Sequence, residues 1–434
     1  MKILIAAAYQ RRKRDVAVLK IQEILKRRRS LALGILAALT PTEYEVEIID
    51  ENNYSIINTQ KNYDLVGISS ITPHALRAYQ VADEFRKRGI TVVLGGYHPS
   101  SLPNEAKQHA DSIVIGEAEE TWPQLLKDFE NNRLKPVYKP ERLVDPRIIP
   151  YAKREEKRGI SRVEEIQATR GCPYRCAFCS IQNTEGHNFR KRPIENVIEE
   201  IKKLNSDHIF FNDNSLTIDP EYTKSLFREL KGLHKHFECH GNINGLNDDE
   251  LLKLSREAGC HTWWIGFESI SQESIDSIDK KTNIVDNYLR TIKKIREHGI
   301  AVRGMFVFGF DGDKRDVFHN TLKAIQKWKL DVAYFFILTP FPSTPIFDRL
   351  KEEGRILTED WSKYNYGSVV FEPKNMSKEE LFNKTREVAK IHYSFTNVMR
   401  RTFDNENLDF SRFASKLGHN LVYDRNFIKR EYRF

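Results

Sequence analysis

Short apolar runs alternate with longer amphipathic segments along the first 130 residues. The apolar runs have the length and composition of buried strands, and the segments between them carry apolar residues at helical spacing. This alternation predicts a parallel α/β domain. We expect strands at residues 2–8, 45–49, 65–68, 91–94 and 112–115, and helices at 30–39, 73–88 and 117–130.

A second series of strands and helices is expected after residue 160. Residues 131–160 contain several prolines among scattered charges, which is typical of an extended linker. The six strands that follow fit a partial (β/α)6 barrel, whose chemistry belongs at the carboxyl ends of its strands. These strands are predicted at 165–169, 209–211, 237–242, 262–267, 301–308 and 332–339, with helices such as 193–204, 220–230 and 248–258 between them.

The predicted fold class is therefore α/β, with a Rossmann-like parallel-sheet domain over 1–130, a linker over 131–160, a barrel over 161–375 and a helical, basic extension over 376–434. Helices expected at 378–390 and 393–403 could close the open side of the barrel. The basic aromatic end of the extension suits either ordinary ring packing or peripheral contact with an anionic membrane. Its residues are Arg400, Arg401, Arg412, Lys416, Arg425, Lys429, Arg430 and Arg433, with Phe403, Phe410, Phe413, Phe427 and Phe434.

The composition of the chain indicates the cellular compartment in which the protein is expected. There is no apolar run of about 18 residues, and the apolar start is too short for a signal peptide, so we expect a cytoplasmic protein. Only five cysteines occur, which excludes a disulfide scaffold and fits a reducing compartment.

The net charge of +8 is concentrated in short basic runs, for example at 11–14, 26–29 and 400–401. Such runs attract phosphates, nucleic acid or an anionic membrane, and they also occur as plain solvated faces. No basic strand with interleaved aromatic residues is present. Nucleic acid is therefore not expected as a partner.

Three cysteines, Cys172, Cys176 and Cys179, lie in one short loop with C-x3-C-x2-C spacing. Three thiolates can hold a four-iron cluster and leave one iron open for substrate or cofactor. A zinc loop is the alternative, but it would need a fourth Cys or His at knuckle spacing. The nearest candidate, His187, has no paired ligand beside it. The two remaining cysteines, Cys239 and Cys260, are expected to be small buried residues.

The cysteine spacing, with Phe178 directly before the third Cys, resembles that of the radical S-adenosylmethionine (SAM) superfamily. The resemblance implies a [4Fe-4S] cluster on Cys172, Cys176 and Cys179, whose open iron binds SAM and whose electron cleaves it to a 5′-deoxyadenosyl radical. It also implies four residues that bind SAM, which are Phe178 at the adenine, Asp213 at the amino group, Glu268 as a further polar contact and Gly309 on the strand that packs on the adenine. Read without the resemblance, Phe178 suits the core and Asp213 suits a turn or helix cap.

The strand ends of the first domain resemble those of the cobalamin-binding domain that precedes many radical SAM domains. Cobalamin is therefore expected near Ser69, Thr72, Gly95, Gly96 and His98, where glycines allow close approach and hydroxyls can bind the ligand. His98 is either a ligand contact or a solvated loop residue. The chain lacks the Asp-x-His-x-x-Gly run that supplies a lower cobalt ligand, so a bound cobalamin would lack that ligand, or the domain would bind nothing.

Residues 240–279, 311–313 and 338–345 resemble the subgroup that contains hopanoid methylases and anaerobic Mg-protoporphyrin monomethyl ester cyclases. In the last run, Ser343 stands where the subgroup has Gly. The resemblance implies cobalamin-dependent methylation of an unactivated carbon, with radical cyclisation or other C–C bond formation as the alternative. It implies a small-molecule substrate (a lipid, tetrapyrrole or natural-product precursor) and an electron donor such as flavodoxin or ferredoxin. A non-catalytic electron carrier is a third possibility, which the open cysteine triad disfavours.

Overall fold

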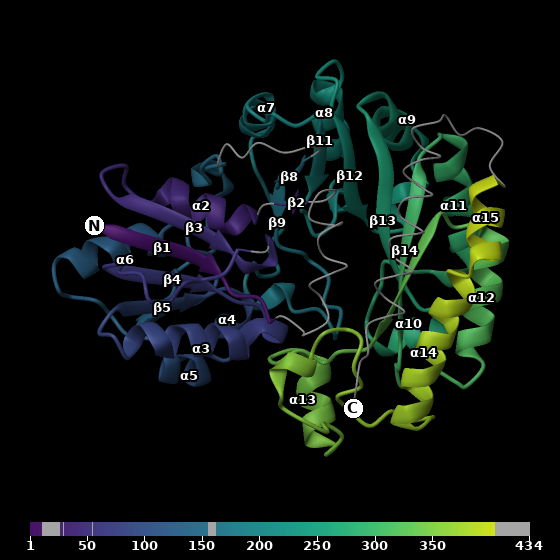
Figure 1. Ribbon diagram of the computed structural model, residues 1–434. Helices are drawn as coiled ribbons and strands as arrows, with labels where there is room; N and C mark the ends of the chain where they lie inside the picture. Colours follow the sequence, from purple (N-terminus) through teal and green to yellow (C-terminus); the bar gives the residue numbers. More distant parts are fainter. Residues whose placement is uncertain (11–26, 29, 54, 155–161, 404–434) are drawn as a thin grey trace.

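The structure is a computed structural model that describes residues 1–10, 27–28, 30–53, 55–154 and 162–403. It contains two parallel sheets that lie side by side. In Figure 1 the first sheet is on the left in purple and blue, and the second is on the right in teal and green. The α/β fold class predicted from the sequence is confirmed.

The first sheet has six parallel strands in the order β3-β1-β4-β5-β6-β7. Alternate residues of β1 face opposite sides: Ile3 and Ile5 pack with helices α2 and α6, whereas Leu4 and Ala6 pack with α3. Both faces are thus covered, which explains why the strands are continuous apolar runs. The elements are β1 (Lys2–Ala7), β3 (Glu45–Asp50), β4 (Leu65–Ser69), β5 (Thr91–Gly95), β6 (Ser112–Val114), β7 (Val137–Tyr138), α2 (Leu31–Leu39), α3 (Ala75–Arg86) and α6 (Thr121–Glu130).

Two very short strands depart from the prediction. β7 lies in the expected linker and pairs with β6 as the edge of the first sheet. β2 (Arg27–Arg28) comes from the expected first domain but pairs with β8 of the second sheet. A strand of two residues has no alternating pattern, so the sequence could not reveal either one.

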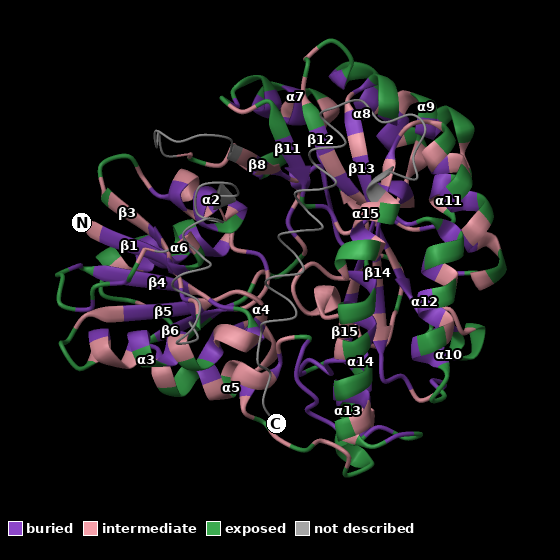
Figure 2. Cartoon of the chain, turned by 45° about the vertical axis from the view of Figure 1, so that its right-hand side comes forward, coloured by how far each residue is buried: buried purple, intermediate pink, exposed green. Residues whose placement is uncertain are grey.

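The second sheet has the order β15-β14-β13-β12-β11-β8-β2. Five of its six long strands lie within two residues of their predicted bounds, whereas β8 begins and ends three residues earlier than predicted. Helices α7, α8, α9, α11 and α12 form one apolar core with the outer face of this sheet, and Figure 2 shows the buried strands against exposed outer helix faces. The bounds are β8 (Arg162–Ile166), β11 (His208–Phe211), β12 (His236–Gly241), β13 (Cys260–Glu268), β14 (Ala301–Phe308), β15 (Val332–Ile337), α7 (Ile194–Lys202), α8 (Pro220–Leu230), α9 (Asp249–Glu257), α11 (Tyr288–Glu297) and α12 (Val317–Trp328).

The segment after β15 joins the two halves of the molecule. Helix α13 (Pro345–Glu352) and the short 3-10 helix η9 (Trp361–Lys363) supply Phe347 and Trp361 to the core beneath α3. Trp361 Nε1 also donates a hydrogen bond to Glu105 of the first domain (2.9 Å). The chain thus returns from the second sheet to close against the first.

The predicted C-terminal helices are present as α14 (Lys378–His392) and α15 (Phe395–Phe403). Helix α14 packs against the edge strand β15, and Tyr393 donates a hydrogen bond to Ala333 O of that strand (2.6 Å). The basic aromatic tail from residue 404 and the basic run at 11–14 lie outside the described residues. Among the described helices, none is both long and apolar enough to cross a membrane.

Candidate active site

The cysteine loop starts at a backbone position that only glycine fits. Gly171 follows the short strand β9 (Thr169–Arg170) and has φ +78°. A Cβ atom there would lie 2.2 Å from Asn188 O, so no other residue could occupy the position without moving the backbone. The amide of Cys172 then bonds to Gly186 O (3.2 Å), which anchors the first cysteine.

All three loop cysteines are partly buried. Burial raises the pKa of the Cys176 thiol to about 11, and it raises the pKa values of Cys172 and Cys179 as well. Binding of iron must therefore release protons from this loop. Within the residues that the structure describes, no three His, Cys, Asp or Glu side chains are arranged to hold a single metal ion.

Asp213 holds the strand that delivers the cysteine loop. It is 1% exposed, and its carboxylate accepts hydrogen bonds from Ala168 N (3.0 Å), Thr169 N and Thr169 Oγ1 (2.6 Å). Burial raises its pKa to about 7 in spite of these bonds. This arrangement supports a positioning role, and contact with the SAM amino group stays a prediction.

Glu268 and Lys280 form a buried ion pair beside the cysteines. Glu268 ends β13 in the left-handed region (φ +57°), and its carboxylate folds back over Gly266, where a Cβ would lie only 2.2 Å from Oε1. Lys280 Nζ donates to that carboxylate at 2.6 Å and lies 5.7 Å from the ring centroid of Phe178. Burial lowers the pKa of Lys280, but the charges of Glu268 and of the cysteines outweigh this and raise it. A fixed cation therefore stands next to the loop.

We expect Lys280→Gln to lose most SAM cleavage. The substitution leaves Glu268 buried without its partner, at a cost of about 3–5 kcal/mol, and removes the cation beside the cysteine loop. The measurement is 5′-deoxyadenosine formation together with the melting temperature. Lys281→Gln is the matched control, because the side chain of Lys281 is 78% exposed and it pairs with Asp279, which is itself largely exposed.

A double variant separates the effect of the Lys280 charge on SAM cleavage from its effect on protein stability. Glu268→Gln with Lys280→Met removes both members of the pair, so much of the lost melting temperature should return. Cleavage activity should not return with it. Recovery of activity in this double variant would show that Lys280 serves folding alone.

Phe178 and Gly309 both lie near the end of the fifth strand, β14. The ring of Phe178 is 6.2 Å from that of Phe310. Gly309 has φ +108°, and a Cβ there would lie 2.9 Å from Leu381 of α14, so this position packs against the C-terminal helix. Contacts of Phe178 and Gly309 with SAM stay predictions.

The predicted cobalamin residues share one edge of the first sheet. Gly96 has φ +93°, and a Cβ there would lie 2.8 Å from Ser69 Oγ, which shows how closely the ends of β4 and β5 approach. Ser70 N bonds to Gly95 O (2.9 Å) and ties the same two ends together. The structure thus brings Ser69, Gly95 and Gly96 to one place, and their contact with cobalamin stays a prediction.

His98 is buried, so the expectation that it is solvated is wrong. Its ring nitrogens lie 3.3 Å from Thr72 Oγ1 and 3.3 Å from Glu105 Oε1, and Trp361 packs against the ring. Sequence reasoning missed this because Trp361 is distant in the chain. A role for His98 and Thr72 toward cobalamin stays a prediction, and in the structure they hold the β5 loop against the segment after β15.

A buried ion network connects the first domain to the cysteine loop. Arg170, directly before Gly171, pairs with Glu117 (2.9 Å) and Glu119 (2.6 Å), and Arg190 also pairs with Glu117 (2.9 Å). Arg170 and both glutamates are at most 8% exposed. The loop after β6 therefore fixes where the cysteine loop begins.

The loop after β5 makes a second junction with the cysteine loop. Ser101 receives hydrogen bonds from Asn183 (3.2 Å to Oγ) and from Ser343 (2.8 Å to the carbonyl). Ser343 has φ +60°, a conformation that glycine adopts without strain. The carboxyl ends of both sheets thus meet at this loop.

We expect Arg170→Gln to lower both the melting temperature and the iron content after anaerobic reconstitution. Removing the guanidinium leaves two buried carboxylates without their main partner, a loss of about 3–5 kcal/mol. Arg147→Gln is the control, since Arg147 is exposed and pairs with nearby Asp145; it should change neither quantity. Unchanged iron content in Arg170→Gln would contradict a positioning role for the network.

Comparison with known proteins agrees with this geometry. Residues 166–325 match the Radical SAM superfamily, residues 29–126 match the B12 binding domain, and residues 344–425 match a domain of unknown function, DUF4070. The chain belongs to the radical SAM superfamily, in the group that carries a B12 binding domain ahead of the radical SAM domain. It is an enzyme, and its cofactors are a [4Fe-4S] cluster, SAM and cobalamin.

Individual relatives cover nearly the whole chain. Bacteriochlorophyllide d C-8(2)-methyltransferase of Chlorobaculum tepidum is 37% identical over 86% of this chain and 88% of that protein. The C-12(1)-methyltransferase of the same organism is 31% identical over 86% and 84%. The fold is similar to that of TsrM, a radical SAM methyltransferase of Kitasatospora setae, with TM-score 0.72, 15% identity and coverage of 98% and 99%.

Sequence reasoning missed the residues that surround the predicted ones. Lys280, Arg170 and the two glutamates carry the strongest electrostatics of the site, yet none was singled out. The available signal was a charged residue next to the cysteine run, in the case of Arg170, and a Gly-Glu-x-Glu run after β6. A buried charge needs a buried partner, so these two features could have been paired.

Proposed function

We propose that this enzyme methylates an unactivated carbon of a cyclic tetrapyrrole. The observation that carries the proposal is the contact between two places: the edge of the first sheet where cobalamin is predicted, and the loop that bears the cysteines. Glu117, Glu119 and Ser101, which follow β6 and β5, contact the loop that bears the cysteines. A substrate held between the two edges would be within reach of both cofactors, as radical methylation requires.

The inner face of the second sheet supports a flat aromatic substrate. Alternate residues of β13 pack outward into the core, so Trp264 faces the other side. There Trp264 stacks on Tyr334 (ring centroids 5.1 Å apart), and Phe210 lies edge-on to both Trp264 (5.9 Å) and His240 (5.2 Å). Arg303 lies 4.9 Å from the Trp264 ring centroid. Arg303 is 4% exposed and pairs with Glu238 (2.6 Å), so the aromatic rings are the features of this face that suit a flat macrocycle.

When bound, the cluster supplies the electron that cleaves SAM, and cobalamin supplies the methyl group. The protein residues position and shield these groups. Gly171 and Asp213 set the course of the cysteine loop, Lys280 holds a positive charge beside it, and Arg170 fixes its distance from the first domain. The relatives named as bacteriochlorophyllide methyltransferases support the same reaction and substrate class. We place the reaction in the cytoplasm, with flavodoxin or ferredoxin as electron donor.

The test uses the anaerobically reconstituted protein with cobalamin, reductant, a bacteriochlorophyllide and SAM that carries a trideuterated methyl group. We expect 5′-deoxyadenosine and a tetrapyrrole in which a trideuterated methyl group has replaced hydrogen. An altered tetrapyrrole without added label would instead establish cyclisation. Label transfer to a lipid but not to a tetrapyrrole would overturn the substrate class.

We expect Trp264→Leu to raise the KM for the tetrapyrrole about fivefold, because stacking on an aromatic ring is worth about 1 kcal/mol beyond area burial. Cleavage of SAM without substrate should stay near the wild-type rate, since Trp264 is not among the residues around the cysteines. The measurement is the KM for the tetrapyrrole beside the uncoupled rate of 5′-deoxyadenosine formation. If the uncoupled rate of 5′-deoxyadenosine formation falls as much as the KM rises, Trp264 belongs to the cofactor site instead.

A further inference from the structure

The inner face of the second sheet carries a continuous row of aromatic rings. Trp264 of β13 stacks on Tyr334 of β15, with ring centroids 5.1 Å apart. Tyr334 lies parallel to Phe336, two residues further along the same strand (6.3 Å), and Phe336 contacts the ring of Tyr366 (5.6 Å), which follows η9. The row therefore runs along β15 toward the carboxyl end of the strand.

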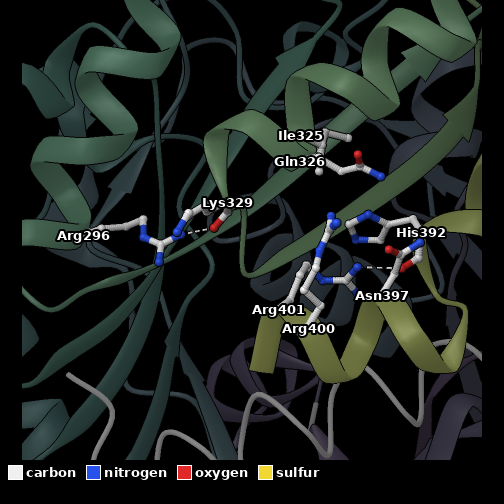
Figure 3. Close-up of a pocket in the computed structure, with 8 residues that line it drawn as sticks. All are labelled: Arg296, Ile325, Gln326, Lys329, His392, Asn397, Arg400 and Arg401. Atoms are coloured by element: carbon white, nitrogen blue, oxygen red, sulfur yellow. Dashed lines mark hydrogen bonds between the residues drawn. The ribbon is translucent and has the colours of Figure 1, made fainter. Parts of the chain in front are cut away.

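The opposite face of β15 is covered by the C-terminal helices. Ala333 and Phe335, which alternate with the ring residues of the row, are buried in the core that includes α14. Figure 3 shows part of the junction between α14 and α15, where Arg401 donates a hydrogen bond to His392 O (2.6 Å). The two ring residues of β15 lie on the other face and are only partly buried. Their free surface is therefore on the inner side of the sheet.

Tyr366 ends the row on the side of the cysteine loop. Its carbonyl accepts a hydrogen bond from Ile337 N at the end of β15 (2.8 Å), and its amide donates to Thr339 Oγ1 (3.2 Å). Burial and the charges of Cys179 and Glu268 raise its pKa to about 12, although the residue is 48% exposed. The ring thus stands beside the predicted cofactor site, where a ligand can still reach it.

The segment after β15 connects Tyr366 to the cysteine loop. The ring of Tyr366 packs edge-on against Phe341 (5.1 Å), which is buried in a core that it shares with the first domain. Five residues further on, Ile346 N donates a hydrogen bond to Ala177 O inside the cysteine loop (3.0 Å). One short segment therefore supports the Tyr366 ring and is bonded to the cysteine loop.

Tyr366 holds this place in an unfavourable backbone conformation. Its φ is +63°, in the left-handed region that a bulky side chain rarely adopts. Such strain persists where the surrounding contacts fix the residue, and it gathers at ligand sites. The hydroxyl of Tyr366 makes no hydrogen bond within the part of the chain that the structure describes. A ring placed at this cost, with its hydroxyl left for another partner, suits contact with a ligand.

We propose that Tyr366 contacts the edge of the tetrapyrrole that faces the cofactors and decides which carbon is methylated. The inference rests on the proposed function. The macrocycle lies along the row, with one edge at Trp264 and the opposite edge at Tyr366. There the phenol hydroxyl donates a hydrogen bond to a carbonyl or carboxylate oxygen on the rim of the substrate. This bond fixes the rotation of the macrocycle in its own plane, and so the peripheral carbon that is within reach of the cofactors.

The first arm of the test measures binding without turnover. A bacteriochlorophyllide is equilibrated by dialysis with the full-length holoenzyme, and SAM and reductant are omitted. Tyr366→Asn removes the ring but keeps a residue that tolerates the left-handed conformation, and it should weaken binding about fivefold, which is the effect of one aromatic contact. Tyr364→Phe is the matched control, because Tyr364 is fully buried and donates its hydroxyl to Thr358 O (2.7 Å). It should bind the tetrapyrrole as the wild type does.

The second arm measures the position of the methyl group. Tyr366→Phe keeps the ring and its packing and loses only the hydroxyl, so its melting temperature should equal that of the wild type. With SAM that carries a trideuterated methyl group, we expect label at a second carbon and about fivefold more 5′-deoxyadenosine per methylated product, which is the effect of one neutral hydrogen bond. Tyr364→Phe should label a single carbon, with the same yield per 5′-deoxyadenosine as the wild type.

The outcomes separate this inference from the proposed function. If the wild type methylates the tetrapyrrole and both Tyr366 variants behave like Tyr364→Phe, the inference is overturned and the proposed function stands. If the wild type binds the tetrapyrrole without methylating it, the proposed reaction fails. Weaker binding by Tyr366→Asn then still supports the contact with the substrate edge, and equal binding overturns it. If the wild type does not bind the tetrapyrrole, both proposals are overturned.

Discussion

The Cys176→Ala variant should form no detectable 5′-deoxyadenosine. The sequence predicts that three thiolates from one loop hold the cluster, and loss of one leaves two, too few to hold a cube with one open iron. The absorbance of the cluster and the iron content after reconstitution should fall together with SAM cleavage. Cobalamin binding should persist, because the residues predicted for it lie on the edge of the first sheet.

Cys239→Ala is the matched control for this variant. Cys239 is fully buried, and its sulfur lies 3.9 Å from that of Cys260, away from the loop. Its loss should lower the melting temperature slightly, through a small cavity, and leave the cluster intact. A Cys176→Ala protein that still cleaves SAM would disprove the assignment of the cluster ligands.

The second large effect is expected from Gly171→Ala. The substitution lowers stability by about 1–2 kcal/mol, because alanine must adopt a left-handed backbone conformation. It also places Cβ 2.2 Å from Asn188 O. The backbone of residues 171 and 188 must separate, which moves Cys172 away from the other two cysteines. We expect loss of most iron binding and SAM cleavage, measured together with the melting temperature.

Gly89→Ala isolates the backbone penalty. Gly89 has a similar φ of +76°, but a Cβ there meets nothing within 4 Å. This variant should lose only the stability that the left-handed backbone conformation costs an alanine, and it should bind iron normally. If Gly171→Ala binds iron as well as Gly89→Ala does, the close approach at Asn188 does not control the loop.

Some predictions from the sequence succeed because they depend on one short segment. The cysteine spacing is such a local property, and the ligand set that it implies stays a prediction. The central strands were predicted correctly because strands such as β1 and β4 are buried on both faces and must be apolar throughout. Helices α8 and α14 were also found, because each has an apolar stripe and a side-chain N-cap, Asp219 and Ser377.

Predictions failed where distant segments meet. His98 seemed to be a solvated loop residue, yet Thr72, Glu105 and Trp361 enclose it. β7 was assigned to a linker because two residues carry no period. These features depend on which surfaces come together, and a propensity for one residue or one short segment contains no information about that.

By itself, the sequence of this radical SAM enzyme determined the two sets of parallel strands and the polar strand ends, and it predicted the cysteine ligands, because each depends on spacing or burial within a short segment. Only the tertiary structure decided how the two sheets face each other. It paired Arg170 with Glu117 and Glu119, and it paired Lys280 with Glu268. The reason is physical: a buried charge or polar atom is stable only with a partner, and packing of the whole chain chooses that partner.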